Sequence, residues 1–231
     1  MDIAYGICQA CGRYTLIQEN LCEPCWKGVL QSTHQMHTYA KCDKCGAPML
    51  HEHAVCLHAG KNRMVIRVGP YTGDLRQLVI RYKKTGIRGL AKPIATLMSR
   101  EIERMVENTT PVAIIPVPCS ERSRRTRGWD HMVLVGRALS ANPKLNLIQV
   151  LERQGRGELK MLGKQQREIE SSRSYRLKAR FGRKELALLN SCKIAFVIDD
   201  VMTTGSTLDT CISLVAGIVD IRILGLCLAM D

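Results

Sequence analysis

The chain has 231 residues, enough for one domain of ordinary size and a small accessory domain. No run of about 18 apolar residues and no basic-then-apolar leader pattern occurs, which predicts a cytoplasmic protein without membrane insertion. Hydrophobic residues make up 45% of the chain but aromatic residues only 4%, so we expect an aliphatic core, and the formal charge of +13 predicts attraction to nucleic acid or to phosphate-rich small ligands.

Cysteine is concentrated at the N-terminus, where seven of the eleven cysteines precede residue 57. Without a secretion signal, paired spacings favour metal binding over disulfides. Cys8-x-x-Cys11 and Cys22-x-x-Cys25 are separated by ten residues, and two such turns place four thiolates around a tetrahedral Zn²⁺. Gly12 suits the positive φ of a tight turn at the first pair. The spacing therefore predicts a zinc site.

A third pair, Cys42-x-x-Cys45, predicts a second zinc site with a mixed set of ligands. Its partners belong to the Cys/His-rich stretch that follows: His51, His53, Cys56 and His58. We favour Cys56 and His58, and pairing interleaved across the three cysteine pairs stays open.

Both predicted metal sites are interpreted as structural. About sixty residues with few large apolar side chains bury too little surface to fold alone, so zinc would supply the folding energy. We therefore expect a Cys-rich zinc-binding domain over residues 1–61 and a second domain over residues 62–231.

Strands and helices are predicted to alternate through the second domain. The expected strands are Met64–Val68, Val112–Ile115, Leu147–Leu151, Lys193–Ile198 and Ile221–Leu228. The expected helices are Gly73–Lys84, Gly89–Asn108, His131–Ala141 and a segment from Leu208 to about Val219. This alternation predicts an α/β fold, a parallel sheet flanked by helices, with ligands at the carboxyl ends of the strands.

Twelve residues, most of them charged or polar, follow the strand at Val112–Ile115 and its Pro116–Pro118 end. We expect a loop there, in which guanidinium groups converge on a pyrophosphate because each pairs bidentately with phosphate oxygens. The loop carries four arginines, Arg122, Arg124, Arg125 and Arg127, of which the last three are the candidate pyrophosphate ligands. A solvated basic loop, or one that contacts nucleic-acid phosphates, is the alternative.

The stretch from Arg153 to Lys184 is dominated by polar and charged residues. A polar insertion of this length in a compact domain is typical of a functional or a disordered segment. We interpret Arg153–Arg173 as a lid that excludes water from a ligand, with a solvated basic helix as the alternative.

The stretch Ala195–Thr207 combines a buried strand with a polar turn. Ala195–Ile198 is a continuous apolar run, typical of a strand buried on both faces of a parallel sheet. Asp199 and Asp200 come where the strand should leave the core. Hydroxyl-rich residues then precede the helix, and they share the ability to bind an anion at a helix N-terminus: Thr203, Thr204, Gly205, Ser206 and Thr207.

Carboxylates beside an anion site favour a phosphorylated ribose or a metal-bound phosphate. A Walker B strand would require a G-x-x-x-x-G-K-[ST] loop, which this sequence lacks. A merely solvated acidic turn is the remaining alternative.

Ala195–Thr207 resembles the phosphoribosyl pyrophosphate signature of type I phosphoribosyltransferases: four mostly hydrophobic residues, two acidic residues and a phosphate loop. Together with the cysteine pairs, nearly the whole chain resembles the ComF family. Tyr82–Lys84 with Gly86 matches a lysine-bearing helix end of that family, and Pro116–Pro118 followed by Arg127–Trp129 matches its pyrophosphate block.

The chain also departs from the family pattern. In the segment before the central strand, Leu162 and Arg167 match, whereas Glu170 occupies the position of an asparagine. The closing cysteine pair of the second zinc module appears as Cys56 with His58.

The resemblance implies a type I phosphoribosyltransferase-like fold that binds phosphoribosyl pyrophosphate with Mg²⁺. Asp199 and Asp200 would be catalytic, accepting hydrogen bonds from the ribose hydroxyls and stabilising positive charge on the ring, while the turn from Thr203 to Thr207 would hold the 5′-phosphate. The leaving pyrophosphate would be neutralised by Lys83, Arg124, Arg125 and Arg127.

Two functions from different classes follow. The first is a phosphoribosyl transferase, in which a nitrogenous nucleophile displaces pyrophosphate. The second is a catalytically silent module that binds a nucleotide or single-stranded DNA, which the net charge favours. For either one, the resemblance implies a role in natural competence, with DNA-uptake or DNA-processing proteins as partners.

Overall fold

The computed structural model describes residues 3–34, 65–106, 110–154, 174–179 and 181–231. Two compact units divide the chain: Met1–Val106 with Asp200–Thr203 and Cys227–Asp231, and Glu107–Asp199 with Thr204–Leu226. The second predicted zinc site (Cys42, Cys45, Cys56, His58) and the expected boundary near residue 61 lie outside the described residues. So do Leu162, Arg167 and Glu170.

A parallel sheet of five strands, in the order β4-β10-β9-β5-β6, confirms the predicted α/β class. Its strands are β4 (Val65–Pro70), β5 (Val112–Pro116), β6 (Leu145–Leu147), β9 (Ile194–Met202) and β10 (Arg222–Met230). Ile114 and Ile115 of β5 and Phe196 and Val197 of β9 are fully buried. Such continuous apolar runs are typical of strands in a sheet that is covered on both faces.

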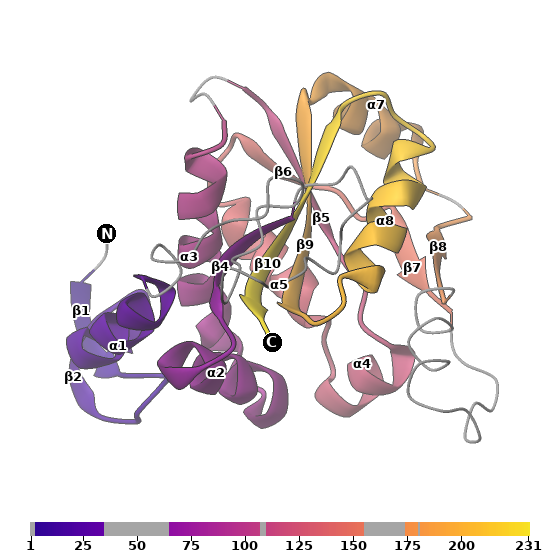
Figure 1. Cartoon of the computed structure of the whole chain (residues 1–231). Coiled ribbons are helices and arrows are strands. Elements are labelled where there is room, and N and C mark those ends of the chain that lie inside the picture. The colour runs from indigo at the N-terminus through magenta and orange to yellow at the C-terminus, as the bar shows by residue number, and fades with distance from the viewer. Residues whose placement is uncertain (1–2, 35–64, 107–109, 155–173, 180) are drawn as a thin grey trace, which may run out of the picture. The chain divides into compact units, whose positions relative to one another are not determined.

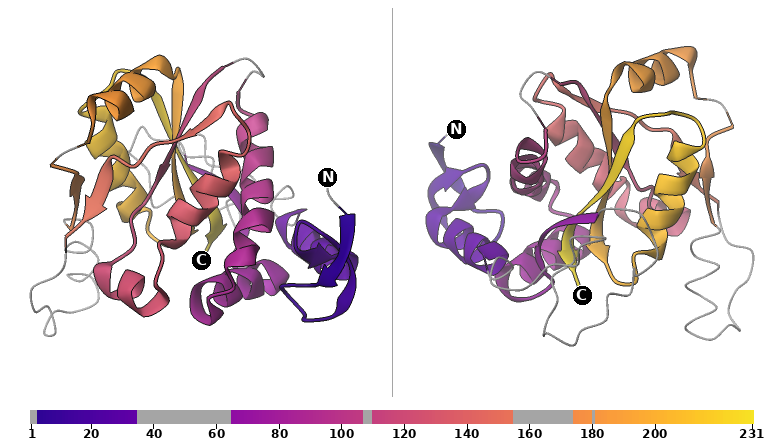
Figure 2. Two further views of the ribbon diagram at one scale, coloured as in Figure 1. Left: turned by 180° about the vertical axis from the view of Figure 1, so that it is seen from behind. Right: turned by 45° about the horizontal axis from the view of Figure 1, so that its top comes forward.

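In the second unit, two helices cover opposite faces of the sheet (Figures 1 and 2). α5 (His131–Leu139) packs against β5 and β6, and α8 (Ser206–Ala216) lies on the other face. Asp130 caps α5 by accepting hydrogen bonds from the N–H groups of Met132 and Val133. The chain continues through β7 (Leu151–Arg153), β8 (Tyr175–Leu177) and α7 (Arg183–Ser191).

In the first unit, the cysteine-rich segment forms an antiparallel sheet of β1 (Ile3–Ile7), β2 (Tyr14–Gln18) and β3 (Leu21–Cys22), followed by α1 (Glu23–His34). Trp26 of α1 is buried and donates its indole N–H to Gln18 O at 2.6 Å, which ties the helix to the sheet. α1 also packs against α2 (Gly73–Ile80), and α3 (Ala91–Glu103) packs against β4.

Three expected elements differ in the structure. The helix expected over Gly73–Lys84 ends as α2 at Ile80 and continues as a π-helical turn, η2 (Arg81–Thr85), which Gly86 terminates at φ 71°. The helix expected from Gly89 begins with a 3₁₀ turn, η3 (Arg88–Leu90), before α3. The single strand expected over Leu147–Leu151 is divided between β6 and β7, and β7 pairs antiparallel with β8 instead of joining the large sheet.

Within the described part of the chain, no helix combines the length and the apolar composition that crossing a bilayer requires.

Candidate functional site

Four cysteines of the first unit form the cluster that the two N-terminal pairs predicted. Ligand atoms of Cys8, Cys11, Cys22 and Cys25 lie within 4.8 Å of one another, and the cluster can hold a zinc ion. The Sγ atoms of Cys11 and Cys22 are 3.7 Å apart, far longer than the roughly 2.05 Å of a disulfide, so both thiols are free.

Backbone geometry around the first pair is that of a metal knuckle. Gly12 adopts φ 77°, as its place after Cys11 predicted, and its N–H donates to Cys8 O at 2.8 Å. The N–H of Cys22 donates to Cys8 Sγ at 3.3 Å, and Arg13 Nε donates to Cys11 Sγ at 3.5 Å. These donors point at sulfur atoms and so favour thiolates over thiols.

The pKa values of three of the four thiols are shifted, and in different directions. Hydrogen bonding from Arg13 lowers the pKa of the exposed Cys11 thiol to about 6. Burial raises the pKa of Cys22 and, more strongly, that of Cys25. A bound dication would compensate the charge that burial disfavours, so the donor set fits Zn²⁺.

Asp199 and Asp200 lie inside β9, which runs to Met202, whereas the sequence placed them beyond the strand. The register explains the difference. Pro116, the last residue of β5, pairs with Ile198, so β9 extends past its neighbour at the carboxyl edge. The backbone therefore stays extended while Asp199 is only half-buried. Asp199 therefore lies at the edge of the core, as expected, but it belongs to the strand and does not follow it.

The turn after β9 has the geometry of an anion-binding helix N-terminus. Gly205 adopts φ 77°, a conformation that disfavours any side chain, and α8 begins at Ser206. The hydroxyls of Thr204 and Ser206 lie 3.0 Å apart, and Thr203 is exposed. The first N–H groups of a helix lack intrahelical acceptors, so this turn offers amides and hydroxyls to one ligand.

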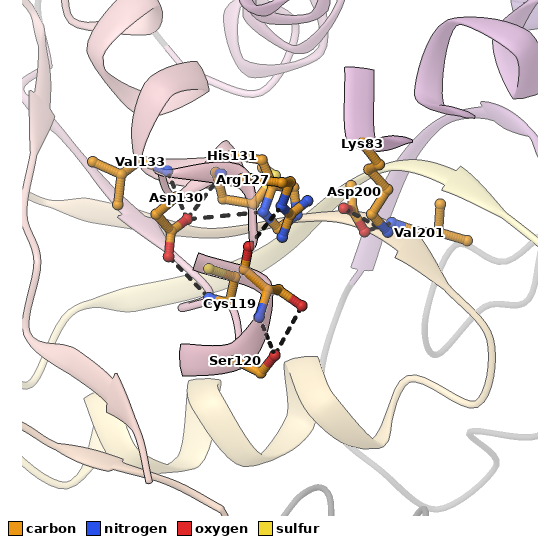
Figure 3. A network of polar contacts seen from close by, with 11 residues as sticks. Lys83, Cys119, Ser120, Arg127, Asp130, His131, Val133, Asp200 and Val201 are labelled. Carbon is orange, nitrogen blue, oxygen red and sulfur yellow. Dashed lines mark hydrogen bonds and ion pairs between the residues drawn. The ribbon is translucent and has the colours of Figure 1, made fainter. Parts of the chain in front are cut away.

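Lys83 and Asp200, both in the first unit, form an ion pair with 2.7 Å between Nζ and Oδ2 (Figure 3). Asp200 Oδ1 also accepts a hydrogen bond of 2.6 Å from the N–H of Val201. The π-helical turn η2 positions Lys83, and such turns are frequent at functional sites. The structure thus brings together two residues that the sequence assigned to different parts of a ligand.

The arginine-rich segment is a helix, α4 (Glu121–Arg127), and the expectation of a loop is wrong. Ser120 caps it by accepting from the N–H of Ser123, and Gly128 ends it at φ 76°. Arg125 is exposed and pairs with Glu121 one turn earlier. Arg124 is exposed, and it shares a helix face with Arg127, three residues later.

Arg127 is half-buried. Its Nε donates to Ser123 O at 3.3 Å, its guanidinium lies 6.0 Å from the Trp129 ring centre, and the Cys119 thiol is a neighbour. Of the three predicted pyrophosphate arginines, Arg127 is therefore the one with a restricted position.

Cys119, Asp130 and His131 form a second cluster, again with ligand atoms within 4.8 Å of one another (Figure 3). Asp130 Oδ2 accepts a 2.9 Å hydrogen bond from the N–H of Cys119, so the carboxylate joins the end of β5 to the start of α5. Burial, followed by the charge of Asp130, raises the pKa of the Cys119 thiol to about 12. This thiol is protonated at neutral pH and is no activated nucleophile.

Tyr175 of β8 lies beside the phosphate turn within the second unit. It is buried, Arg153 of β7 stacks 4.9 Å from its ring centre, and Thr207 is one of its polar neighbours. Arg153 is itself held by Ser174, whose Oγ accepts from its Nε at 3.1 Å. Burial raises the pKa of Tyr175, and the nearby Asp199 adds to that rise.

The sequence analysis assigned no ligand-binding role to Asp130 or to Tyr175. The signal for Asp130 was present, because an Asp directly before an apolar helical run is a common helix cap. Nothing indicated Tyr175, and Arg153 was expected only as the first residue of a lid; the two stand 22 positions apart in short, polar strands without a clear period.

No family model matches the chain. It is 27% identical over 230 residues to Competence protein F of Haemophilus influenzae, and the alignment covers 93% of each chain. This similarity covers most of the chain and supports a ComF-like family.

Proposed function

We propose that the chain is a ComF-like protein that binds phosphoribosyl pyrophosphate with Mg²⁺ and acts in natural competence. The turn between β9 and α8 carries the proposal: two carboxylates precede a positive-φ glycine and a helix N-terminus lined by hydroxyls. A 5′-phosphate fits the amides and hydroxyls of that turn, and ribose hydroxyls fit the carboxylates.

Within this proposal, the turn from Thr203 to Thr207 binds the 5′-phosphate. Asp199 and Asp200 accept hydrogen bonds from the ribose hydroxyls and stabilise positive charge that develops on the ring during transfer. Lys83 and Arg127, with Arg124 and Arg125, neutralise the pyrophosphate. Mg²⁺ carried by the ligand would supply further neutralisation of the phosphate oxygens.

The proposed reaction is transfer of the phosphoribosyl group to a nitrogenous nucleophile, with pyrophosphate as leaving group. The nucleophile's nitrogen forms a bond to ribose C1′ as the bond from C1′ to the pyrophosphate oxygen breaks. No side chain of the turn serves as nucleophile, so these residues act by positioning and by electrostatics.

For the N-terminal segment, we propose a structural zinc domain over residues 1–61 and a phosphoribosyltransferase-like domain over residues 62–231. The four-cysteine cluster supports the zinc assignment. The name of the Haemophilus influenzae protein supports a competence-related role, with DNA-uptake or DNA-processing proteins as partners.

Calorimetry with the paired variant Asp199→Asn/Asp200→Asn tests the pocket. We expect Mg²⁺-dependent binding of phosphoribosyl pyrophosphate to the parent chain and its loss in the variant, while circular dichroism stays unchanged. Asp220→Asn, the same substitution at an exposed site, is the control and should bind as the parent does. Equal affinity in the parent and the paired variant would refute the assignment of the carboxylates.

A silent module that binds single-stranded DNA is the second candidate, and the net charge of +13 favours it. Its affinity for DNA should fall steeply with salt, because binding releases counterions from the phosphates. A flat salt response would exclude phosphate-driven binding. Pyrophosphate release from phosphoribosyl pyrophosphate, measured with candidate bases, separates the transferase from the silent module.

A further inference from the structure

We propose that Cys119, Asp130 and His131 form a binding site for one transition-metal dication of the Zn²⁺ class, separate from the N-terminal cysteine cluster. The site belongs to the second unit and does not depend on the phosphoribosyl assignment. Figure 3 shows the three side chains gathered between the end of β5 and the start of α5.

The distances suit a common ligand. The donor atoms of the three residues lie within 4.8 Å of one another, and His131 Nδ1 is 3.9 Å from Asp130 Oδ1. That separation is too long for a hydrogen bond. Zinc bonds of about 2.0–2.3 Å put tetrahedral ligands about 3.3–3.6 Å apart, so a small inward movement of each side chain would complete the set.

The donor types suit a borderline-soft dication. A thiolate, an imidazole and a carboxylate are the three protein ligands of Zn²⁺, whereas Mg²⁺ and Ca²⁺ take oxygen ligands. Three protein ligands leave one position open for water or another ligand. A carboxylate oxygen of Asp199 also lies within 4.8 Å of a His131 ring nitrogen.

The surroundings hold the ligands in place. Asp130 is oriented by the N–H groups of Cys119, Met132 and Val133, which is the kind of outer contact that fixes metal-binding carboxylates. The side chains of Asp130 and His131 are 15% and 8% exposed. Arg127 is a neighbour of the Cys119 thiol.

Helix capping explains Asp130 but neither of its neighbours. A cap needs one side-chain oxygen, and Asn caps helices about as well as Asp. It requires neither a thiol nor an imidazole within reach of the carboxylate. Asp130→Asn keeps one oxygen for the cap while removing the anionic ligand, and because it also removes the acceptor of the Cys119 N–H, its circular dichroism is read together with its zinc content.

The test measures zinc bound by the full chain after loading and gel filtration, with folding checked by circular dichroism. We expect Cys119→Ser and Asp130→Asn each to bind one equivalent less than the parent. Cys192→Ser, at a buried cysteine outside both clusters, should bind as much as the parent. Combining Cys119→Ser with Cys8→Ser should remove one equivalent more than Cys8→Ser alone.

Equal zinc content in the parent and Cys119→Ser would overturn the proposal. So would a loss in Cys119→Ser that Asp130→Asn does not share, because the carboxylate would then be a cap only. If Cys119→Ser fails to fold, the Asp130→Asn result decides. Replacing zinc by Co²⁺ adds a second readout, since the thiolate charge-transfer absorption should fall by one sulfur's contribution in Cys119→Ser.

Discussion

Lys83 Nζ lies 2.7 Å from Asp200 Oδ2. The sequence predicted that this lysine binds pyrophosphate and that this aspartate binds ribose, but in the structure their charges neutralise each other. The Asp200 side chain is 8% exposed and that of Lys83 35%. A carboxylate this deeply placed needs a partner, because burial without one disfavours its charge. A ligand that carries hydroxyls and phosphates can replace both halves of the pair. The ion pair thus offsets part of the cost of burying the Asp200 carboxylate.

Replacing Lys83 by Met should destabilise the chain. The substitution keeps most of the aliphatic stem but leaves Asp200 without its cation, which we expect to cost about 1–3 kcal/mol of unfolding free energy. Lys84→Met, at the exposed neighbour, should change stability by less than about 0.5 kcal/mol. Urea unfolding of both variants checks the difference, and similar values for the two would show that the ion pair contributes no stability.

Substitution of Gly205 should damage both stability and ligand binding. Its φ of 77° is a left-handed conformation, so Gly205→Ala should cost about 1–2 kcal/mol. Gly217 at φ −73° is the control, since Ala is compatible with that conformation and should be neutral or slightly stabilising. Thermal unfolding and a phosphoribosyl pyrophosphate titration measure the two effects. If the two variants behave alike, the left-handed turn is not what matters at this position.

Tyr175→Phe should weaken phosphoribosyl pyrophosphate binding while the fold is retained. The variant removes the hydroxyl that neighbours Thr207 but keeps the ring under Arg153. One neutral hydrogen bond corresponds to about 0.5–1.5 kcal/mol, or about a twofold to tenfold rise in Kd. Tyr5→Phe, on an exposed ring, serves as control. An unchanged Kd in Tyr175→Phe would remove Tyr175 from the positioning of Thr207.

The N-terminal cluster should lose zinc and structure together. Cys8 and Cys22 are buried, so Cys8→Ser or Cys22→Ser should release one zinc equivalent and unfold β1–β3, because metal binding supplies folding energy. Chelation of the parent should give the same loss of structure, followed by circular dichroism. Retention of the native spectrum after complete removal of zinc would contradict a structural role.

Long apolar patterns made much of the fold predictable. β5 and β9 are buried runs whose burial on both faces fits only a covered parallel sheet. Polar elements were harder. α4 contains no buried residue and its arginines suggested a loop, yet Ser120 before it and Gly128 after it are ordinary helix boundaries. Local capping signals were more informative there than composition.

The candidate site was predictable only where it is continuous in sequence. The N-terminal cluster was predictable because its two cysteine pairs and Gly12 lie close together in the sequence. The contacts of Lys83 with Asp200, and of Tyr175 with Thr207, depend on segments brought together by tertiary packing. Spacing along the chain carries no information about such pairs.

Titration of the full chain with phosphoribosyl pyrophosphate, with and without Mg²⁺, addresses the proposed pocket without any variant. We predict saturable one-to-one binding that requires Mg²⁺, and weaker binding of ribose 5-phosphate or pyrophosphate alone, because each occupies only part of the pocket. Absence of saturable binding of phosphoribosyl pyrophosphate in the presence of Mg²⁺, to a chain with native circular dichroism, would contradict the proposed function.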